Sequence, residues 1–298
     1  MSFRLLECLL VDNNCYKKYH TDHITPTGII VHSTDKADGD LKRYVQPASN
    51  QSIGLMDNGE PVTAEEMIAI LGKNIYNNSW NRPAAQGAVH GAIGRLANGS
   101  YAVVKTLDYT QPCWGAYKGP SGSYDGRLWT DSGQIAGGTL YVQFEIVEDG
   151  DAPSKEHCTI TYELAVKFSA YLCRIFPTIK IENIISHKEA NKRGRASAHG
   201  DPEAYWKRVG VDYTMDGFRA AVKAALEKDL PAPEYGFLGF PDVSEDDWYA
   251  GALEWAVEHK IVLASGKPFN PEMALTKASA IVLLRRMWNA VMAEKGGA

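Results

Sequence analysis

Cysteine is scarce in this chain of 298 residues, and its five copies form an odd number. They show neither the paired Cys-x-x-Cys spacing of structural zinc sites nor the density of a disulfide framework. We therefore expect reduced structural thiols in a protein made in a cytoplasm. The five are Cys8, Cys15, Cys113, Cys158 and Cys173.

Long apolar runs are also missing. No stretch of 18 apolar residues occurs, and Arg4 and Glu7 interrupt the N-terminal segment where the apolar core of a signal peptide would lie. The sequence thus predicts no transmembrane helix and no membrane partner. It also leads us to expect synthesis in the cytoplasm without a signal peptide.

An excess of positive charge is absent as well. The 31 Lys and Arg residues against 36 Asp and Glu residues give a formal net charge of −5, which offers no electrostatic reason to expect a nucleic-acid partner. One small basic cluster stands out, at Lys188 and residues 192–195. The Gly-rich stretch 113–124 lacks the Gly-Lys-Ser/Thr ending of a phosphate-binding loop, so we interpret it as a loop that lines a groove.

Apolar residues make up 45% of the chain, enough at this length for one substantial domain and one small one. Runs in which apolar and polar residues alternate predict strands, and Asn98-Gly99 is a turn signal that would join the second and third strands into a hairpin. Helices are expected to begin at Thr63, which forms a capping box with Glu66, and near Ser154. This order predicts an α/β fold with a central mixed β-sheet flanked by helices. The expected strands are 28–33, 88–94, 101–107, 140–147 and 181–186, and a third helix is expected at 214–227.

Two of the expected strands end close to histidines. His32 closes the first strand, His187 follows the last, and Asp201 lies further along the chain. Two imidazoles and a carboxylate suit zinc, which keeps a fourth position for water and lowers the pKa of that water from about 15.7 to roughly 7. A single histidine at a strand end is more often a hydrogen-bonded structural residue, so spacing alone leaves both interpretations open.

Several segments in a fixed order favour the metal site. They are Gly28–Thr34, Leu41–Pro47, Asn78–Asn81, Ala88–Gly94, Tyr141–Ile146, Ile184–His187 and Thr214–Arg219. In this order and with matching connections, these segments resemble the zinc-dependent N-acetylmuramoyl-L-alanine amidases of the type 2 family, close to forms in clostridial genomes and their phages. The resemblance runs from about residue 6 to residue 227.

The resemblance implies a role for each site residue. The zinc ligands fall on His32, His187 and Asp201, the general base on Glu145, and the oxyanion donor on His199. Other interpretations are a buried salt-bridged carboxylate for Glu145 and a solvent-exposed loop histidine for His199.

Two further features of the sequence bear on the family pattern. His90, between small apolar residues, is expected to be a structural core histidine. The chain departs from the family at Trp114-Gly115-Ala116, where relatives carry Trp-His-x-Gly, so the details of substrate contact are expected to differ.

A Pro-bearing linker at 229–237 separates a second pattern at 238–298. Five segments of this pattern together resemble one S-layer homology module: Phe240–Val243, Trp248-Tyr249, Ala252–Val257, Phe269–Pro271 and Leu275–Ala278. The resemblance implies a small all-α unit that binds cell-wall polysaccharide. Apolar side chains are expected to face its core, namely Trp248, Leu253, Trp255 and Val257.

The expected ligand contact of this module is the start of its last helix. Thr276 is the expected N-cap there, and Lys277 and Ser279 replace the arginine and glutamate of relatives. A lysine does not reproduce the bidentate fork of arginine. Self-association into a homo-oligomer therefore remains an alternative to wall binding, since a single small module has a thin core.

Taken together, the resemblances imply a peptidoglycan hydrolase that acts at the bacterial cell wall, in the manner of a phage or prophage endolysin. The expected catalytic domain is 1–228, and its substrate is the amide bond between N-acetylmuramic acid and L-alanine. Two alternatives remain: a non-catalytic peptidoglycan-binding recognition protein, and a Cys-His hydrolase that uses Cys113.

Overall fold

The computed structural model describes two compact units, a larger one at Phe3–Lys228 and a smaller one formed largely by residues 229–298. The described residues are 3–34, 38–85, 87–116, 140–151, 153–193, 196–227, 238, 240, 243, 249–259, 261–262, 269, 280–281, 283–288 and 292. The linker 229–237, residues 117–124 of the Gly-rich stretch, Arg195, Trp248, Thr276, Lys277 and Ser279 lie outside them.

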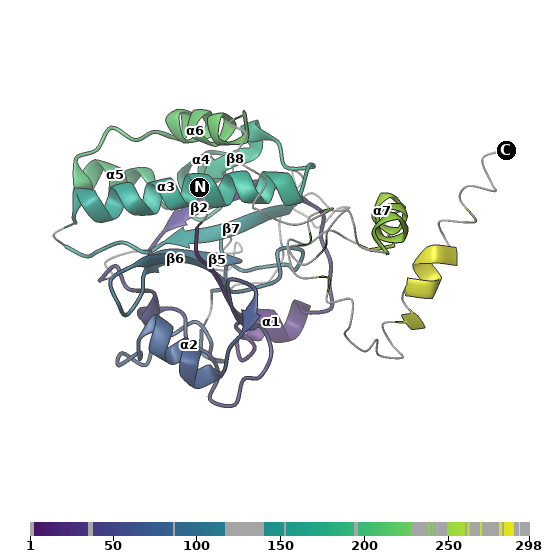
Figure 1. Ribbon diagram of the computed structural model, residues 1–298. Coiled ribbons are helices and arrows are strands. Elements are labelled where there is room, and N and C mark those ends of the chain that lie inside the picture. The colour runs from purple at the N-terminus through teal and green to yellow at the C-terminus, as the bar shows by residue number, and fades with distance from the viewer. Residues whose placement is uncertain are drawn as a thin grey trace. The chain divides into compact units, whose positions relative to one another are not determined.

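An eight-stranded mixed sheet runs through the larger unit in the order β4-β3-β1-β6-β5-β7-β2-β8 (Figure 1). Strand β2 lies between β7 and β8 and is parallel to both, whereas β5 and β6 form an antiparallel hairpin. The predicted α/β fold with a mixed sheet is therefore confirmed. The strands are β1 (Leu5–Cys8), β2 (Pro26–Ser33), β3 (Leu55–Asp57), β4 (Glu60–Pro61), β5 (Gly91–Arg95), β6 (Tyr101–Lys105), β7 (Leu140–Ile146) and β8 (Ile184–Ser186).

Helices cover both faces of this sheet, with α3, α5 and α6 on one side and α1 and α2 on the other (Figure 1). The long helix α3 packs Leu164, Ala165 and Phe168 into the largest apolar cluster, and α2 packs Met67 and Leu71 into a second one. The helices of this unit are α1 (Asn14–Tyr19), α2 (Ala64–Leu71), α3 (Lys155–Ile175), α4 (His187–Lys192), α5 (Glu203–Val209) and α6 (Met215–Glu227).

The alternation of strand side chains positions the polar residues of the sheet. On β7, Val142, Phe144 and Ile146 belong to the cluster beneath α3. Because successive strand residues point to opposite faces, Gln143 and Glu145 project away from α3. The centre of the sheet thus presents an apolar face to α3 and a face with two polar side chains to the other side.

Several local predictions are confirmed. Thr63 and Glu66 form the capping box of α2, Ser154 caps α3, and Gly99 takes the left-handed conformation in the β5–β6 turn with φ of 83°. These features depend on neighbours in sequence, which is why local patterns predict them.

Other boundaries differ from the prediction. The strand expected at 88–94 begins only at Gly91, so His90 precedes it. In the strand expected at 181–186, Ile181–Asn183 is a 3-10 turn and only Ile184–Ser186 pairs with β2. Strands β1, β3 and β4 and helices α1, α4 and α5 were not predicted, because they are too short for a clear periodicity.

In the smaller unit, helix α7 (Ala250–Glu258) packs Leu253 against Phe240 and Val243. Trp255, expected in the core, is instead 40% exposed and stacks on His259 at a centroid distance of 4.6 Å. Across the described parts of both units, none of the helices has the length and apolar character needed to cross a membrane.

Candidate metal centre

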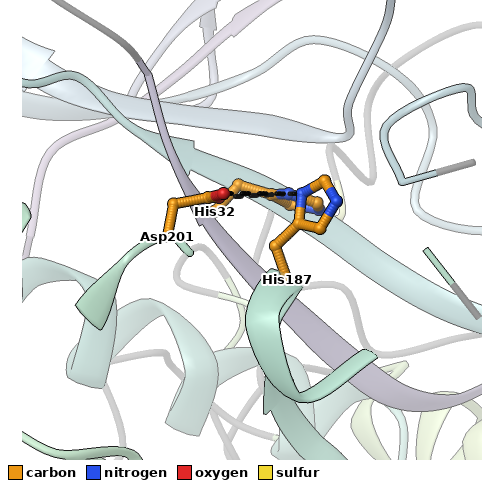
Figure 2. A group of neighbouring side chains, drawn as sticks. All are labelled: His32, His187 and Asp201. Atoms are coloured by element: carbon orange, nitrogen blue, oxygen red, sulfur yellow. Dashed lines mark hydrogen bonds and ion pairs between the residues drawn. The ribbon is translucent and has the colours of Figure 1, made fainter. Parts of the chain in front are cut away.

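Three separate elements bring His32, His187 and Asp201 together (Figure 2). Val31 of β2 pairs with Ser186 of β8, so a histidine follows each member of this pair. As the sequence predicts, His187 comes directly after the last strand, and in the structure it is the first residue of α4. Ser186 caps this helix in a capping box with Glu189, which turns the chain sharply at His187.

The ligand atoms lie at separations that suit a tetrahedral metal ion. The two Nδ1 atoms of His32 and His187 are 2.9 Å apart, and each lies 3.7 Å from a different carboxylate oxygen of Asp201. With one ligand atom from each residue, all three atoms lie within 4.8 Å of one another. Zinc bonds of about 2.0 to 2.1 Å in tetrahedral geometry place neighbouring ligand atoms about 3.4 Å apart. The observed distances bracket this value, so small side-chain adjustments suffice to bind the ion.

The outer nitrogens of both rings face acceptors. His32 Nε2 donates to Gln143 Oε1 at 2.9 Å, and His187 Nε2 donates to the Ser197 carbonyl at 3.1 Å. In a neutral imidazole one nitrogen carries the hydrogen and the other carries a lone pair. Both Nδ1 lone pairs therefore face each other, an arrangement that positive charge between them stabilises.

The electrostatics of the three residues agree with this geometry. Burial disfavours the charged form of His187 and, together with the neighbouring His32, lowers its pKa to about 3. Burial acts in the same direction on His32, but the hydrogen bond and charge of Asp201 and the charge of Glu145 outweigh it and raise its pKa. The Asp201 carboxylate also accepts from the Ser33 N–H at 3.1 Å. The raised pKa of His32 and the adjacent Asp201 carboxylate both favour a positive charge at this position.

Glu145 lies beside the three residues, as the register partner of His32 on the adjacent strand. Its Oε2 is buried and makes no hydrogen bond to any of the described residues. Burial raises the pKa of Glu145 to about 8, with Asp201 and Glu148 acting in the same direction and His32 opposing them. The salt-bridged interpretation of Glu145 finds no cationic Arg or Lys partner among the described residues.

His199 is exposed, and its ring centroid lies 4.7 Å from that of His187. It lines a cavity of about 540 Å³ together with Glu145, His187 and Asp201. A volume of this size accommodates a small organic ligand or part of a polymer. The structure thus brings all five predicted site residues into one region.

Other residues also line this cavity. Trp114 and Gly115 belong to the stretch that the sequence predicts to line a groove, whereas Trp80 and Arg208 were not assigned to the site. Arg208 forms an ion pair with the buried Glu148, which accepts from Ser33 Oγ at 2.6 Å. Contacts between such distant positions leave no spacing pattern in the sequence. One signal was available in the sequence: Ser33 directly follows the predicted ligand His32, so a place for Ser33 near the site could have been inferred.

Gln143 and Ser197, the acceptors for the two ligand histidines, were missed as well. Gln143 stands two positions before Glu145, so strand alternation would have placed both on the face that carries the site. Ser197 lies in an irregular segment before α5, where the sequence has no periodicity to use.

The structure also bears on the interpretations of His90 as a core histidine and of Cys113 as a catalytic nucleophile. His90 is fully buried, donates from Nε2 to the Gln111 carbonyl at 2.8 Å and accepts from the Gln143 N–H at 2.9 Å, which confirms a structural core histidine. Burial raises the pKa of the Cys113 thiol to about 12, which opposes the thiolate that a Cys-His hydrolase requires. All five cysteines are buried free thiols, as expected.

Comparison with known proteins gives one family match. Residues 239–281 match the S-layer homology domain, which confirms the resemblance predicted for this segment. No curated protein matches the chain in sequence.

Among solved structures, the chain is similar to the catalytic domain of PlyG, with 15% identity and a TM-score of 0.38 over 72% of this chain and 94% of that one. PlyL has 14% identity and a TM-score of 0.37, over 74% and 97% of the two chains. The hydrolase AmiA of Staphylococcus aureus, solved with its ligand, has 15% identity and a TM-score of 0.36, over 68% and 73%.

Proposed function

We propose that this chain is a zinc-dependent N-acetylmuramoyl-L-alanine amidase, a peptidoglycan hydrolase that acts at the bacterial cell wall as a phage or prophage endolysin. The observation that carries the proposal is the convergence of two imidazole nitrogens and the Asp201 carboxylate beside a cavity that is also lined by Glu145, one oxygen of which is buried and unpaired among the described residues. A purely structural metal site would be closed by a fourth protein ligand.

The donor set favours zinc over harder cations. Two imidazole nitrogens and one carboxylate oxygen suit zinc, whereas calcium and magnesium prefer oxygen ligands throughout. When bound, zinc polarises a substrate carbonyl and lowers the pKa of water at its open position. His32, His187 and Asp201 would hold it, with Gln143 and Ser197 fixing the orientation of the two rings.

Glu145 is the proposed proton carrier. Its raised pKa means that the carboxyl exchanges protons near neutral pH, which suits a group that alternates between base and acid. It takes a proton from the attacking water and delivers it to the nitrogen of the leaving L-alanine. The reaction therefore breaks the bond between the lactyl carbonyl carbon of muramic acid and the amine, and leaves a carboxylate and a free N-terminus.

His199 is the proposed donor to the oxyanion that develops on the carbonyl oxygen. Its ring lies next to His187 at the exposed side of the cavity, where a substrate oxygen can approach it. A preorganised donor at such a position stabilises the transition state more than the ground state.

Other cavity residues fit a glycopeptide substrate. Trp80 and Trp114 offer aromatic surfaces to sugar rings and apolar side chains. The Arg208 guanidinium, which pairs with Glu148 through one nitrogen, has further N–H donors for a peptide carboxylate. The alternative of a non-catalytic recognition protein is disfavoured, because such proteins of this fold have lost a metal ligand whereas all three ligand positions and Glu145 are present here.

The S-layer homology segment supports a second partner, the cell-wall polysaccharide. Attachment through this unit would keep the enzyme on its insoluble substrate and raise the local concentration of scissile bonds.

Mass spectrometry of digested cell walls tests the reaction. The expected products are glycan strands with free lactyl carboxylates and peptides with new N-terminal L-alanine, produced by zinc-loaded protein and absent after chelation. Replacement of the exposed His20 by Ala serves as the control and should leave the products unchanged. Full activity in a metal-free preparation, or cleavage at another bond, would contradict the proposal.

A further inference from the structure

Gly115 leaves room for the side chain that contacts His32. A Cβ atom at position 115 would overlap with Gln143 Oε1 and would lie 3.2 Å from Gln143 Cδ. This Oε1 is the atom that accepts the hydrogen bond from His32 Nε2 at 2.9 Å. The Gln143 amide can therefore occupy this position only because residue 115 has no side chain.

The backbone of Gln143 is held in place independently of its side chain. Its N–H donates to His90 Nδ1 at 2.9 Å, and its carbonyl accepts from the His90 N–H at 2.8 Å. His90 is in turn fixed by the Gln111 carbonyl. Because these hydrogen bonds hold the backbone of β7 at Gln143, a side chain at position 115 would be accommodated mainly by rotation of the Gln143 side chain away from His32.

The segment around Gly115 also supports the second histidine. The Ala116 carbonyl accepts from the Ser197 N–H at 3.0 Å, and the Ser197 carbonyl accepts from His187 Nε2. Trp114 anchors the segment through its N–H to the Ala88 carbonyl at 3.1 Å. One short stretch of chain therefore lies against the acceptors of both ligand histidines.

We propose that Gln143 is a positioning residue for His32, and that glycine at 115 is required because it admits the Gln143 amide. An acceptor at Nε2 keeps the hydrogen of the ring on that nitrogen, which leaves the Nδ1 lone pair for the metal and fixes the plane of the ring. This inference rests on the metal centre of the proposed function. It assigns a structural reason to the Gly115 departure from the family pattern.

Zinc affinity of the purified full-length chain, measured by competition with a chelator, tests the role of Gln143. Gln143→Leu keeps the approximate volume and removes the acceptor, so zinc should bind about 10- to 100-fold more weakly. Gln143→Glu keeps an acceptor and should bind zinc as tightly as the parent or more tightly. The visible absorption of the cobalt-loaded protein gives a second readout, which should change in Gln143→Leu and be restored in Gln143→Glu.

Val142→Ala is the matched control. Val142 is fully buried on the same strand but faces the opposite side, so its truncation should lower stability without changing zinc affinity. Equal zinc affinity in the parent and Gln143→Leu would overturn the inference while leaving the metal centre intact. Failure of the parent chain to bind zinc would instead overturn the proposed function.

A double-mutant cycle tests the coupling to Gly115. Gly115→Ala should weaken zinc binding in the parent and have no further effect in the Gln143→Ala background, because the displaced acceptor is already gone. The same Cβ would also lie 2.8 Å from Val89 Cγ1, and an effect through that contact would persist in both backgrounds. Such persistence would overturn the coupling. Gly87→Ala, where a Cβ meets nothing within 4 Å, is the control and should leave zinc affinity unchanged.

Discussion

His32 on β2 and Glu145 on β7 are register partners on adjacent parallel strands. The pairing places a buried carboxyl beside the imidazole of a candidate metal ligand without any contribution from loops. The hydrogen-bond ladder of the sheet therefore determines the relative position of the proposed ligand and the proposed proton carrier.

Removal of any single ligand should abolish zinc binding. Replacement of His32, His187 or Asp201 by Ala leaves two ligands, which hold zinc poorly, so both metal content and activity should be lost. Zinc should also stabilise the parent by about 2.7 kcal/mol at a free concentration a hundredfold above its dissociation constant. Metal analysis and thermal unfolding with and without chelator measure both effects. A ligand variant that retained one zinc per chain would remove that residue from the site.

Glu145→Ala should retain zinc and lose turnover by on the order of a hundredfold or more, since a proton-transfer group is lost. Glu145→Gln should behave in the same way, because the amide keeps the shape but cannot exchange the proton. Metal content and the rate of peptide release from walls are measured on the same preparations. Loss of zinc in both variants would make Glu145 a ligand.

His199→Ala should likewise retain zinc and lower turnover by about a hundredfold, as expected for a missing oxyanion donor. The exposed His23 is the matched control, and His23→Ala should have the activity of the parent. Parent-like turnover in His199→Ala would favour the interpretation of a solvent-exposed loop histidine.

Acid should destabilise the larger unit through His90. Burial lowers the folded-state pKa of His90 to about 4, below its usual value of 6.5. As pH falls below 6.5 the unfolded chain takes up this proton first, so the free energy of unfolding should decrease through the window from 6.5 to 4.

The contribution of His90 should be on the order of 2 kcal/mol between pH 7 and pH 5. His90→Gln should reduce this loss, whereas His23→Gln at an exposed position should not. Denaturant unfolding at the two pH values measures the difference. An unchanged pH dependence in His90→Gln would show that other groups cause the acid sensitivity.

Truncation after residue 228 separates wall attachment from catalysis. The shortened chain should hydrolyse a soluble muramyl peptide at the parent rate but sediment less with native host walls. Added salt should weaken attachment of the full-length chain, since Lys277 is the expected contact of this unit with an anionic polymer. Equal sedimentation of both forms at equal salt would make self-association the better role for the S-layer homology unit.

Local sequence was sufficient for features that depend on near neighbours. The capping box of Thr63 and Glu66, the Ser154 cap and the Asn98-Gly99 turn involve residues a few positions apart, so their side chains meet whatever the rest of the chain does. The same reasoning could have found α4, because Ser186 and Glu189 have capping-box spacing. The positions of the candidate ligands came from the family resemblance rather than from periodicity.

Only the tertiary structure decided how these ligands are held. His32 and His187 are 155 positions apart in the sequence, yet their Nδ1 atoms are 2.9 Å apart. His32 and Gln143 are 111 positions apart, yet His32 Nε2 and Gln143 Oε1 are also 2.9 Å apart. Such contacts exist because β7, β2 and β8 are neighbours in the sheet, an order that no local pattern encodes. For the same reason the sequence marked Gly115 only as a departure from a motif, whereas packing against Gln143 supplies the physical reason for a residue without a side chain.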